Sequence, residues 1–271
     1  MNTLQLARRA LPGGGWAMKI NGLSEITGRF DAMLIDQYGV IHDGQTLYPG
    51  SLHVLSNLAR LKLPVVIMTN SGKRAKANCE RIIRMGVPRA HFVDVISSGE
   101  ALYRSLAAKK VFLVGRDGED YGLDGVTITD DARRADVMLI LGSNAPQYTL
   151  ADYRKLFKSI TLPAICGNPD KQMLTPQGMQ PAPGAIAALY EEMGGKVTWI
   201  GKPYAAIYQS ACELAGNPGR VLCIGDSAEH DVAGGRGASL STLLVMQGVS
   251  AGLDAGMVKP TPDYWMESFQ W

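Results

Sequence analysis

The stretch Ala32-Met33-Leu34-Ile35-Asp36-Gln37-Tyr38-Gly39-Val40 decides the fold. Its first four residues are apolar at consecutive positions, which is typical of a strand covered on both faces, and the strand then ends in a carboxylate. Strands of this kind occur in parallel sheets flanked by helices. Because ligands of open α/β sheets bind beyond the carboxyl ends of the strands, polar residues at those ends are the candidates for chemistry.

Similar apolar runs recur along the chain, separated by segments whose apolar residues have helical spacing. The predicted strands are residues 32–36, 64–70, 92–96, 111–115, 137–142, 163–167, 197–201, 221–226 and 242–246. The predicted helices are residues 51–61, 73–85, 99–108, 150–160, 185–193 and 205–215. This alternation predicts an α/β fold with a parallel sheet and right-handed crossovers.

The composition is that of a globular chain. It has 271 residues, of which 46% are hydrophobic, 19% are charged and 31 are glycine. At roughly 150 residues per domain the length corresponds to about 1.8 domains. The net charge is +2 and the basic pairs Arg8–Arg9 and Arg133–Arg134 are short, so no nucleic-acid partner is expected. No apolar stretch approaches the ~20 residues that span a bilayer, so no membrane partner is expected.

The N-terminal segment and the cysteines favour a cytoplasmic location. Residues 11–15, Leu-Pro-Gly-Gly-Gly, interrupt the apolar run that a secretory signal would need. Met18 is an alternative start, because the regular pattern begins just after it. The four cysteines are Cys79, Cys166, Cys212 and Cys223. Their wide spacing argues against a disulfide framework, and the four histidines lack zinc-ligand spacing.

Three predicted strands end in reactive side chains: Leu34-Ile35-Asp36, residues 67–70 and residues 223–226. A carboxylate at the edge of a sheet is costly unless it is paired or bound to a metal. Asp36 and Asp226, on strands that can be neighbours, therefore form a candidate Mg²⁺ site. Asp231, five residues after Asp226, is a candidate to hold the loop or a metal-bound water.

Other strand ends offer groups that suit a phosphate. Thr69 and Asn70, with Ser71-Gly72 expected to open a helix, supply hydroxyl, amide and backbone donors. Lys202 supplies a cation at another strand-to-helix turn. Each feature alone is common in structural turns and caps. Taken together in this order, they indicate phosphoryl transfer through an aspartyl-phosphate.

These segments resemble the four motifs of the haloacid dehalogenase-like phosphatases. The matching segments are residues 36–40 (DQYGV), 69–71 (TNS), 201–203 (GKP) and 225–231 (GDSAEHD). Two further features narrow the resemblance to the class IIA, NagD-like and p-nitrophenyl phosphatase-like branch of the family. One is Asn168-Pro169-Asp170 followed by Pro183-Gly184, and the other is the tail 242–248, which resembles the last core strand of that branch. The resemblance covers roughly residues 22 to 265.

The resemblance implies a Rossmann-like core with a parallel sheet, interrupted after its third strand by a large α/β cap. The core is then expected at residues 1–104 and 199–271 and the cap at 105–198. The implied activity is a Mg²⁺-dependent phosphatase of a small phosphorylated metabolite, such as a sugar phosphate, a phosphoglycolate-like acid or a nucleotide. Members of the family often dimerise through the cap, so a homodimer is a further expectation.

The resemblance also implies roles for individual residues. Asp36 corresponds to the nucleophile and a Mg²⁺ ligand, Asp226 to a second ligand, and Lys202 to the cation that steadies the phosphoryl group. The implied phosphate-binding residues are Thr69, Asn70, Ser71 and Lys202. The implied metal-binding residues are Asp36, Tyr38 through its backbone carbonyl, Asp226 and Asp231. The cap loop expected to face the substrate is Asn168, Pro169, Asp170 and Lys171.

Tyr38 departs from the family pattern. The family has a second Asp two residues after the nucleophile, where it acts as general acid and base. General acid–base help is typically worth about 10²–10⁴-fold, and a phenol with a pKa of about 10 is a poor base near neutrality. The replacement of this Asp by Tyr38 leaves metal binding through the backbone possible and puts proton transfer in question.

Three interpretations of Tyr38 remain open. Turnover is slowed, least for substrates with good leaving groups; or His42 or Asp43 takes over the proton work; or turnover is lost and the chain binds a phosphorylated metabolite without hydrolysing it. As ordinary loop residues, His42, Asp43 and His230 need no catalytic role. Dinucleotide-binding dehydrogenases and P-loop nucleotidases are disfavoured, because the chain has no G-x-G-x-x-G after its first strand and no P-loop.

Overall fold

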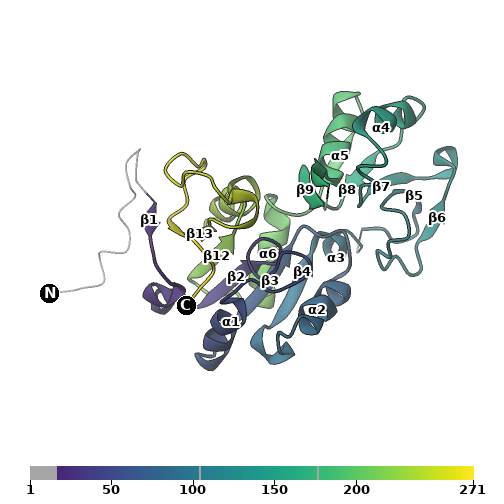
Figure 1. Cartoon of the computed structure of the whole chain (residues 1–271). Coiled ribbons are helices and arrows are strands. Elements are labelled where there is room, and N and C mark those ends of the chain that lie inside the picture. Colours follow the sequence, from purple (N-terminus) through teal and green to yellow (C-terminus); the bar gives the residue numbers. More distant parts are fainter. Residues whose placement is uncertain (1–16, 104, 176) are drawn as a thin grey trace.

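The computed structural model describes residues 17–103, 105–175 and 177–271. The predictions that concern residues 1–16, including the pair Arg8–Arg9, lie outside the described residues. The described chain forms two parallel sheets, one of seven and one of five strands, and a separate two-stranded hairpin (Figure 1). The predicted mixed α/β fold with parallel sheets is thereby confirmed.

The larger sheet has the strand order β1-β14-β13-β12-β2-β3-β4. Its strands are β1 (Met18–Lys19), β2 (Ala32–Asp36), β3 (Val65–Thr69), β4 (Asp94–Ser97), β12 (Val221–Gly225), β13 (Ser241–Val245) and β14 (Tyr264–Met266). All neighbouring pairs in it are parallel. Strands β2 and β12 lie side by side at its centre, although some 190 residues separate them in the sequence.

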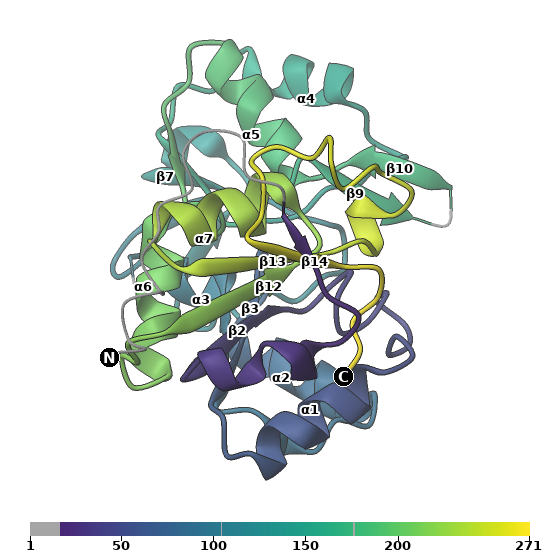
Figure 2. The same cartoon turned by 90° about the vertical axis from the view of Figure 1, so that its left-hand side faces the viewer.

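Helices cover both faces of this sheet (Figure 2). They are α1 (Ser51–Arg60), α2 (Ala75–Arg84), α3 (Ser98–Tyr103), α6 (Ala205–Leu214) and α7 (Ala233–Gly237). Ile35 packs with Val54 of α1 on one face, and Leu34 packs with Tyr208 of α6 on the other. Because successive side chains of a strand point to opposite faces, this double cover explains why β2 is apolar at every position before Asp36.

The smaller sheet has the order β11-β8-β7-β5-β6 and is also parallel throughout. Its strands are β5 (Lys110–Val114), β6 (Thr127–Thr129), β7 (Val137–Ile140), β8 (Ala164–Cys166) and β11 (Val197–Trp199), and the hairpin comprises β9 (Gln172–Thr175) and β10 (Gly178–Pro181). Helices α4 (Leu150–Phe157) and α5 (Pro183–Glu192) pack on it. Thr149 and Asp152 close a reciprocal capping box at the start of α4.

Short helical turns complete the structure: η1 (Leu23–Glu25), η2 (Thr27–Arg29), η3 (Arg89–His91), η4 (Ala132–Arg134), the π-turn η5 (Ala228–Val232) and η6 (Gly248–Ser250). Within the described ranges, no helix has both the length and the apolar character needed to cross a membrane.

Several predicted elements differ from the structure. Helix α3 ends at Tyr103 rather than continuing through residue 108, and Ala108 has a φ of 60° that is incompatible with a helix. Strand β13 is not the last core strand, because β14 and β1 extend the sheet beyond it. The sequence patterns also missed β6 and the β9–β10 hairpin, since these short, exposed strands carry no continuous apolar run.

Candidate active site

Polar residues gather where the strands of the larger sheet end. Asp36 is the last residue of β2, and Asp226 directly follows β12. Ile35 and Ile224 are partners in the parallel register of these two strands, so the two aspartates emerge side by side. On the other flank Asp36 pairs with Met68, which places Thr69 at the end of β3 beside it. The prediction that Asp36 and Asp226 lie on neighbouring strands is confirmed.

Three buried carboxylates form the floor of the site. One oxygen each of Asp36, Asp226 and Asp231 lies within 4.8 Å of the others, and the three residues are only 7%, 4% and 1% exposed. Asp231 reaches this position from the π-turn η5, where Gly225 leaves space for it: a Cβ at Gly225 would lie 1.9 Å from the Asp231 carboxyl carbon. The structure therefore brings together the three aspartates that the sequence singled out.

Lys202 joins two of the three carboxylates. Its Nζ lies 2.8 Å from Oδ1 of Asp36 and 2.7 Å from Oδ1 of Asp231. The lysine is buried, and the Asn70 amide fixes its backbone: Lys202 N–H donates to Asn70 Oδ1 at 2.6 Å, and Asn70 Nδ2 donates to the Lys202 carbonyl at 3.1 Å. One side chain from the end of β3 thus holds the lysine turn between β11 and α6 in place.

The floor carries more negative than positive charge. Burial raises the pKa of Asp36 to about 7, although Lys202 acts in the opposite direction. Burial also raises the pKa of Asp226 well above its ordinary value, and the neighbouring Asp36 and Asp231 add to this effect. Burial disfavours the charge of Lys202, but the two carboxylates that it bridges raise its pKa overall. A buried excess of carboxylate charge is stable when a cation offsets it.

A divalent cation fits this floor. Asp226 has no ion-pair partner among the described residues, and its Oδ2 accepts one hydrogen bond, from the Val249 N–H at 2.7 Å. Carboxylate oxygens are the ligands that hard cations such as Mg²⁺ prefer. The donor set of Asp36, Asp226 and Asp231 matches that preference.

Two glycines let backbone segments close in on Asp226. A Cβ at Gly39 or at Gly248 would lie 1.9 Å from Asp226 Oδ2, and both residues have positive φ, +80° and +52°. The loop after β2 is thereby pressed against the carboxylates. No donor of the described residues forms a hydrogen bond with the Tyr38 carbonyl in this loop, so that oxygen is available for a further ligand.

The segment after β3 differs in part from the prediction. Thr69 and Asn70 are buried at the strand end as expected, and Thr69 Oγ1 accepts a hydrogen bond from the Ser71 N–H at 3.3 Å. Helix α2, however, begins only at Ala75, so Ser71-Gly72 does not open it directly. The intervening loop packs against the smaller sheet, since a Cβ at Gly72 would lie 2.8 Å from the Leu141 carbonyl oxygen.

The loop Asn168–Lys171 lies against the core residues, as the resemblance implied. Asp170 Oδ1 accepts a hydrogen bond from Asn70 Nδ2 at 2.8 Å and lies 3.6 Å from His230 Nδ1. The Lys171 Nζ lies 2.6 Å from Glu229 Oε1. The loop is further held by its own turn, in which the Asp170 N–H donates to Asn168 Oδ1. Pro169 packs on Gly201, where a Cβ would lie 2.8 Å from the Pro169 Cδ.

Tyr38 stands at the edge of the site, 38% exposed, with its ring edge-to-face on His42 at 4.4 Å between centroids. His42 is fully buried, its Nδ1 accepts the Gly44 N–H at 2.8 Å, and its Nε2 lies 2.9 Å from the Gln37 amide. Burial lowers the pKa of His42 to about 4. With both ring nitrogens engaged, His42 is poorly placed to move protons.

Asp43 is also occupied structurally. Its Oδ1 accepts hydrogen bonds from the N–H groups of Gln45 and Thr46, both at 2.8 Å, and these bonds lower its pKa. This is the turn role of an Asp before Gly44 that the sequence allowed. The interpretation in which His42 or Asp43 replaces the missing general acid is therefore disfavoured by the geometry.

Sequence reasoning missed three contributors. Ser98, directly after β4, is buried and its hydroxyl donates to Asn70 Oδ1 at 3.4 Å. The rule that strand ends carry chemistry could have found it. The Gly248-Val249 contact with Asp226 and the approach of Arg81 to Tyr38 had no local signal, because each depends on how distant segments pack.

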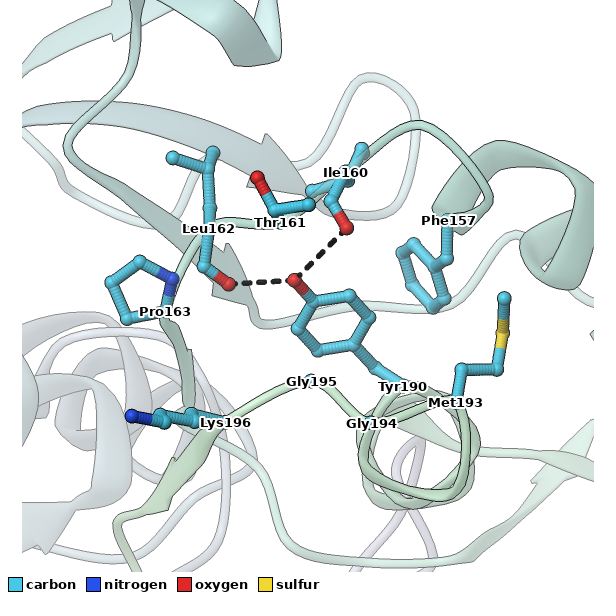
Figure 3. A pocket seen from close by; sticks show the side chains of 10 residues that line it. All are labelled: Phe157, Ile160, Thr161, Leu162, Pro163, Tyr190, Met193, Gly194, Gly195 and Lys196. Atoms are coloured by element: carbon cyan, nitrogen blue, oxygen red, sulfur yellow. Dashed lines mark hydrogen bonds between the residues drawn. The ribbon is translucent and has the colours of Figure 1, made fainter.

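A cavity of about 470 Å³ lies elsewhere, between α4, α5 and the smaller sheet (Figure 3). Its lining residues are Phe157, Ile160, Thr161, Leu162, Pro163, Tyr190, Met193, Gly194, Gly195 and Lys196. The Tyr190 hydroxyl donates to the carbonyls of Leu162 at 2.6 Å and Ile160 at 3.4 Å. The cavity adjoins the amino ends of β8 and β11 and contains no carboxylate, so the clustered catalytic groups lie at a different place.

Comparisons with known proteins agree with this site. Residues 33–129 match the haloacid dehalogenase-like hydrolase family, and residues 199–271 match a second family described as HAD-hydrolase-like. Chronophin of Bos taurus is 26% identical over 91% of this chain and 93% of its own. Ribonucleotide monophosphatase NagD of Escherichia coli K12 is 26% identical over 81% and 88%. A haloacid dehalogenase-like hydrolase from Brucella suis superposes with a TM-score of 0.83, at 26% identity, over 92% and 99% of the two chains.

Proposed function

The chain belongs to the haloacid dehalogenase-like hydrolases, in their class IIA, NagD-like branch, and on this premise we propose that it is a Mg²⁺-dependent phosphatase of a small phosphorylated metabolite. The phosphatases among its relatives, such as ribonucleotide monophosphatase NagD, support a phosphoric-monoester hydrolase. The observation that carries the mechanistic proposal is the floor of the site: Asp36, Asp226 and Asp231 converge at one sheet edge, and Lys202 bridges two of them.

Asp36 is the proposed nucleophile. Both oxygens of Asp231 are committed, Oδ1 to Lys202 and Oδ2 to the Ser227 N–H at 3.1 Å. Asp36 uses only Oδ1, which meets Lys202 and the Gln37 N–H at 2.7 Å. Its Oδ2 is left to attack the phosphorus as the ester P–O bond breaks, which forms an aspartyl-phosphate and releases the alcohol. Water then hydrolyses the aspartyl-phosphate and regenerates the carboxylate.

Asp36, Asp226, Asp231 and the backbone carbonyl of Tyr38 would hold the Mg²⁺. When bound, the ion offsets the repulsion between the carboxylate and the phosphate dianion. Lys202 contributes a fixed positive charge to the same end, and its two carboxylate partners keep it protonated. Thr69, Asn70 and Ser71 are the proposed partners of the phosphoryl oxygens, because they line the end of β3 next to Asp36. Asn70 would contribute its backbone N–H, since its side-chain amide already donates to Asp170 and to the Lys202 carbonyl.

Tyr38 makes slow turnover the expected behaviour. The alcohol leaves with a proton, and the phenol of Tyr38 is a poor proton donor near neutrality. His42 and Asp43 are poor donors as well, because both are held in hydrogen bonds of the local turn. Esters with good leaving groups need the least help and are therefore the best expected substrates. The position of Tyr38 also favours one alternative function, a protein that binds a phosphorylated metabolite through the same floor without hydrolysing it.

We further propose that the chain divides into a core, residues 1–104 and 199–271, and a cap, residues 105–198. The second sheet supports this division, with strands from Lys110 to Trp199. The contact of Asp170 with Asn70 supports a role for the cap loop Asn168–Lys171 in choosing small substrates. We also propose a cytoplasmic location, which the four free cysteines favour, and a homodimer formed through the cap.

The test is a panel of phosphate esters, including p-nitrophenyl phosphate, assayed with Mg²⁺ and with chelator. We expect phosphate release that requires Mg²⁺ and is lost in Asp36→Asn. If no ester is hydrolysed but a phosphorylated metabolite raises the melting temperature, the binding alternative replaces the phosphatase.

A further inference from the structure

Arg81 on α2 occupies an unusual position for an arginine. Its guanidinium carbon lies 5.5 Å from the centroid of the Tyr38 ring, and the residue is partly buried. Among the described residues, no carboxylate or carbonyl forms a hydrogen bond or ion pair with this guanidinium, in contrast to Arg74, which Glu100 clamps at 2.7 and 3.0 Å. A partly buried cation without an acceptor is costly, and burial correspondingly lowers the pKa of Arg81.

The surroundings do not neutralise Arg81. Glu119, in the segment after β5, raises the pKa of Arg81 by its charge, but its carboxylate is 2.5 Å from Lys73 Nζ and is already paired there. Arg84, one turn further along α2, adds a second positive charge. None of the described carboxylates therefore forms a salt bridge with the Arg81 guanidinium.

Arg81 is connected to the catalytic site through Tyr38. Tyr38 is two residues after Asp36, and the next residue, Gly39, packs directly on the Asp226 carboxylate. Tyr38 thus links the Arg81 guanidinium to the loop that packs on the carboxylates. A guanidinium that rests on an aromatic ring keeps the N–H donors of its edge free for a planar bidentate partner.

We propose that Arg81, positioned by Tyr38, binds a second anionic group of the substrate, a carboxylate, and so selects phosphorylated carboxylic acids. This inference rests on the proposed function, because it takes the phosphate to lie at Asp36. It also gives Tyr38 a positive role. An Asp at this position would place a carboxylate beside Arg81 and compete with the substrate for it, whereas a tyrosine supports the guanidinium and leaves its donors free.

Binding of unreactive phosphonates tests the subsite without requiring turnover. Titration calorimetry with Mg²⁺ compares three ω-phosphonocarboxylates, with two, three and four carbons, with alkylphosphonates of the same lengths. We expect at least one carboxylate to bind about tenfold more tightly than its alkyl partner, a difference of about 1.4 kcal/mol. Arg81→Met should abolish the preference. Arg81→Lys should retain only part of it, because lysine lacks the planar guanidinium that binds a carboxylate through two N–H donors.

Arg84→Met is the matched control, since Arg84 lies on the same helix, is exposed and, among the described residues, makes only a distant pair with Glu80 at 3.9 Å. It should retain the carboxylate preference. In turnover assays Arg81→Met should raise KM for phosphorylated carboxylic acids and leave KM for p-nitrophenyl phosphate unchanged. Circular dichroism checks that both variants fold.

Absence of a carboxylate preference at every chain length overturns the subsite, as does an equal loss of preference in Arg81→Met and Arg84→Met. Failure of the phosphatase proposal looks different: no ester is hydrolysed, yet the preference and its dependence on Arg81 persist. The two proposals therefore stand or fall on separate readouts.

Discussion

The floor and the rim of the active site are built in different ways. We call Asp36, Asp226, Asp231 and Lys202 the floor, and Tyr38, His42, Asp43 and Arg81 the rim. The floor is buried and its charges are interlocked, with Lys202 joining Asp36 to Asp231. On the rim, Tyr38 is exposed, His42 and Asp43 hold a local turn, and Arg81 has no acceptor among the described residues.

This difference separates two tasks. The residues of the floor match the motifs of the family, and under the proposed function they hold and activate a phosphoryl group. The rim departs from that pattern at the position that delivers the proton. We infer that phosphate handling is retained while proton delivery and substrate choice have been altered. Variants of the two regions should therefore fail in different ways.

Asp36→Asn should have the largest effect. The amide is not a nucleophile, so phosphate release should fall by about 10⁴-fold or more with every ester. The amide is nearly isosteric with the carboxylate, so the melting temperature should stay close to that of the wild type or rise, because buried negative charge is removed. Measurable turnover by Asp36→Asn would place the nucleophile elsewhere and would contradict the role proposed for Asp36 in the floor.

Lys202→Met should cost stability as well as activity. Removal of the lysine leaves two buried carboxylates without their cation, and breaking a buried ion pair in this way typically costs about 3–5 kcal/mol. Urea unfolding measures the loss. The matched control is Lys171→Met, which breaks the exposed pair with Glu229 and should cost less than about 1 kcal/mol. Equal losses in the two variants would contradict the interlocked floor.

Tyr38→Asp sharpens the comparison from the rim. Restoring an acid at this position should raise kcat by about 10²-fold for alkyl phosphates, which have poor leaving groups, and much less for p-nitrophenyl phosphate. Tyr38→Phe, which keeps the ring beside Arg81, should leave the rate nearly unchanged. If Tyr38→Asp does not accelerate alkyl phosphates, another group already supplies the proton, and the rim is not deficient in the way proposed.

The floor could be predicted from the sequence because each of its parts has a local signal. Asp36 and Asp226 each end an apolar strand, and parallel strands bring their carboxyl ends to one edge. Asp231 lies five residues after Asp226, and Lys202 lies in the turn that directly follows another strand, β11. The central strands β2 and β12 were likewise predicted within one residue of their observed bounds.

The rim could not be predicted in the same way. Arg81 lies 43 residues after Tyr38 on a helix that carries two other basic side chains, Lys76 and Arg84, and only packing shows that it meets the ring. The contact of Asp170 with Asn70 spans 100 residues and depends on how the two sheets meet. Strands β1 and β14, of two and three residues, are fixed by their pairing rather than by any periodic pattern.

His42 offers the smallest test, through pH. Burial lowers its pKa to about 4, against an ordinary value near 6.5. Between these two pH values the unfolded chain therefore binds a proton at His42 and the folded chain does not. Stability should therefore fall as the pH drops from 6.5 toward 4, by on the order of 2 kcal/mol at pH 5 from this residue. Unfolding of His42→Gln over this range should show a shallower decline, whereas His53→Gln, at an exposed position, serves as control. Parallel curves for His42→Gln and the wild type would mean that His42 is open to solvent, and the proton-relay interpretation would then regain support.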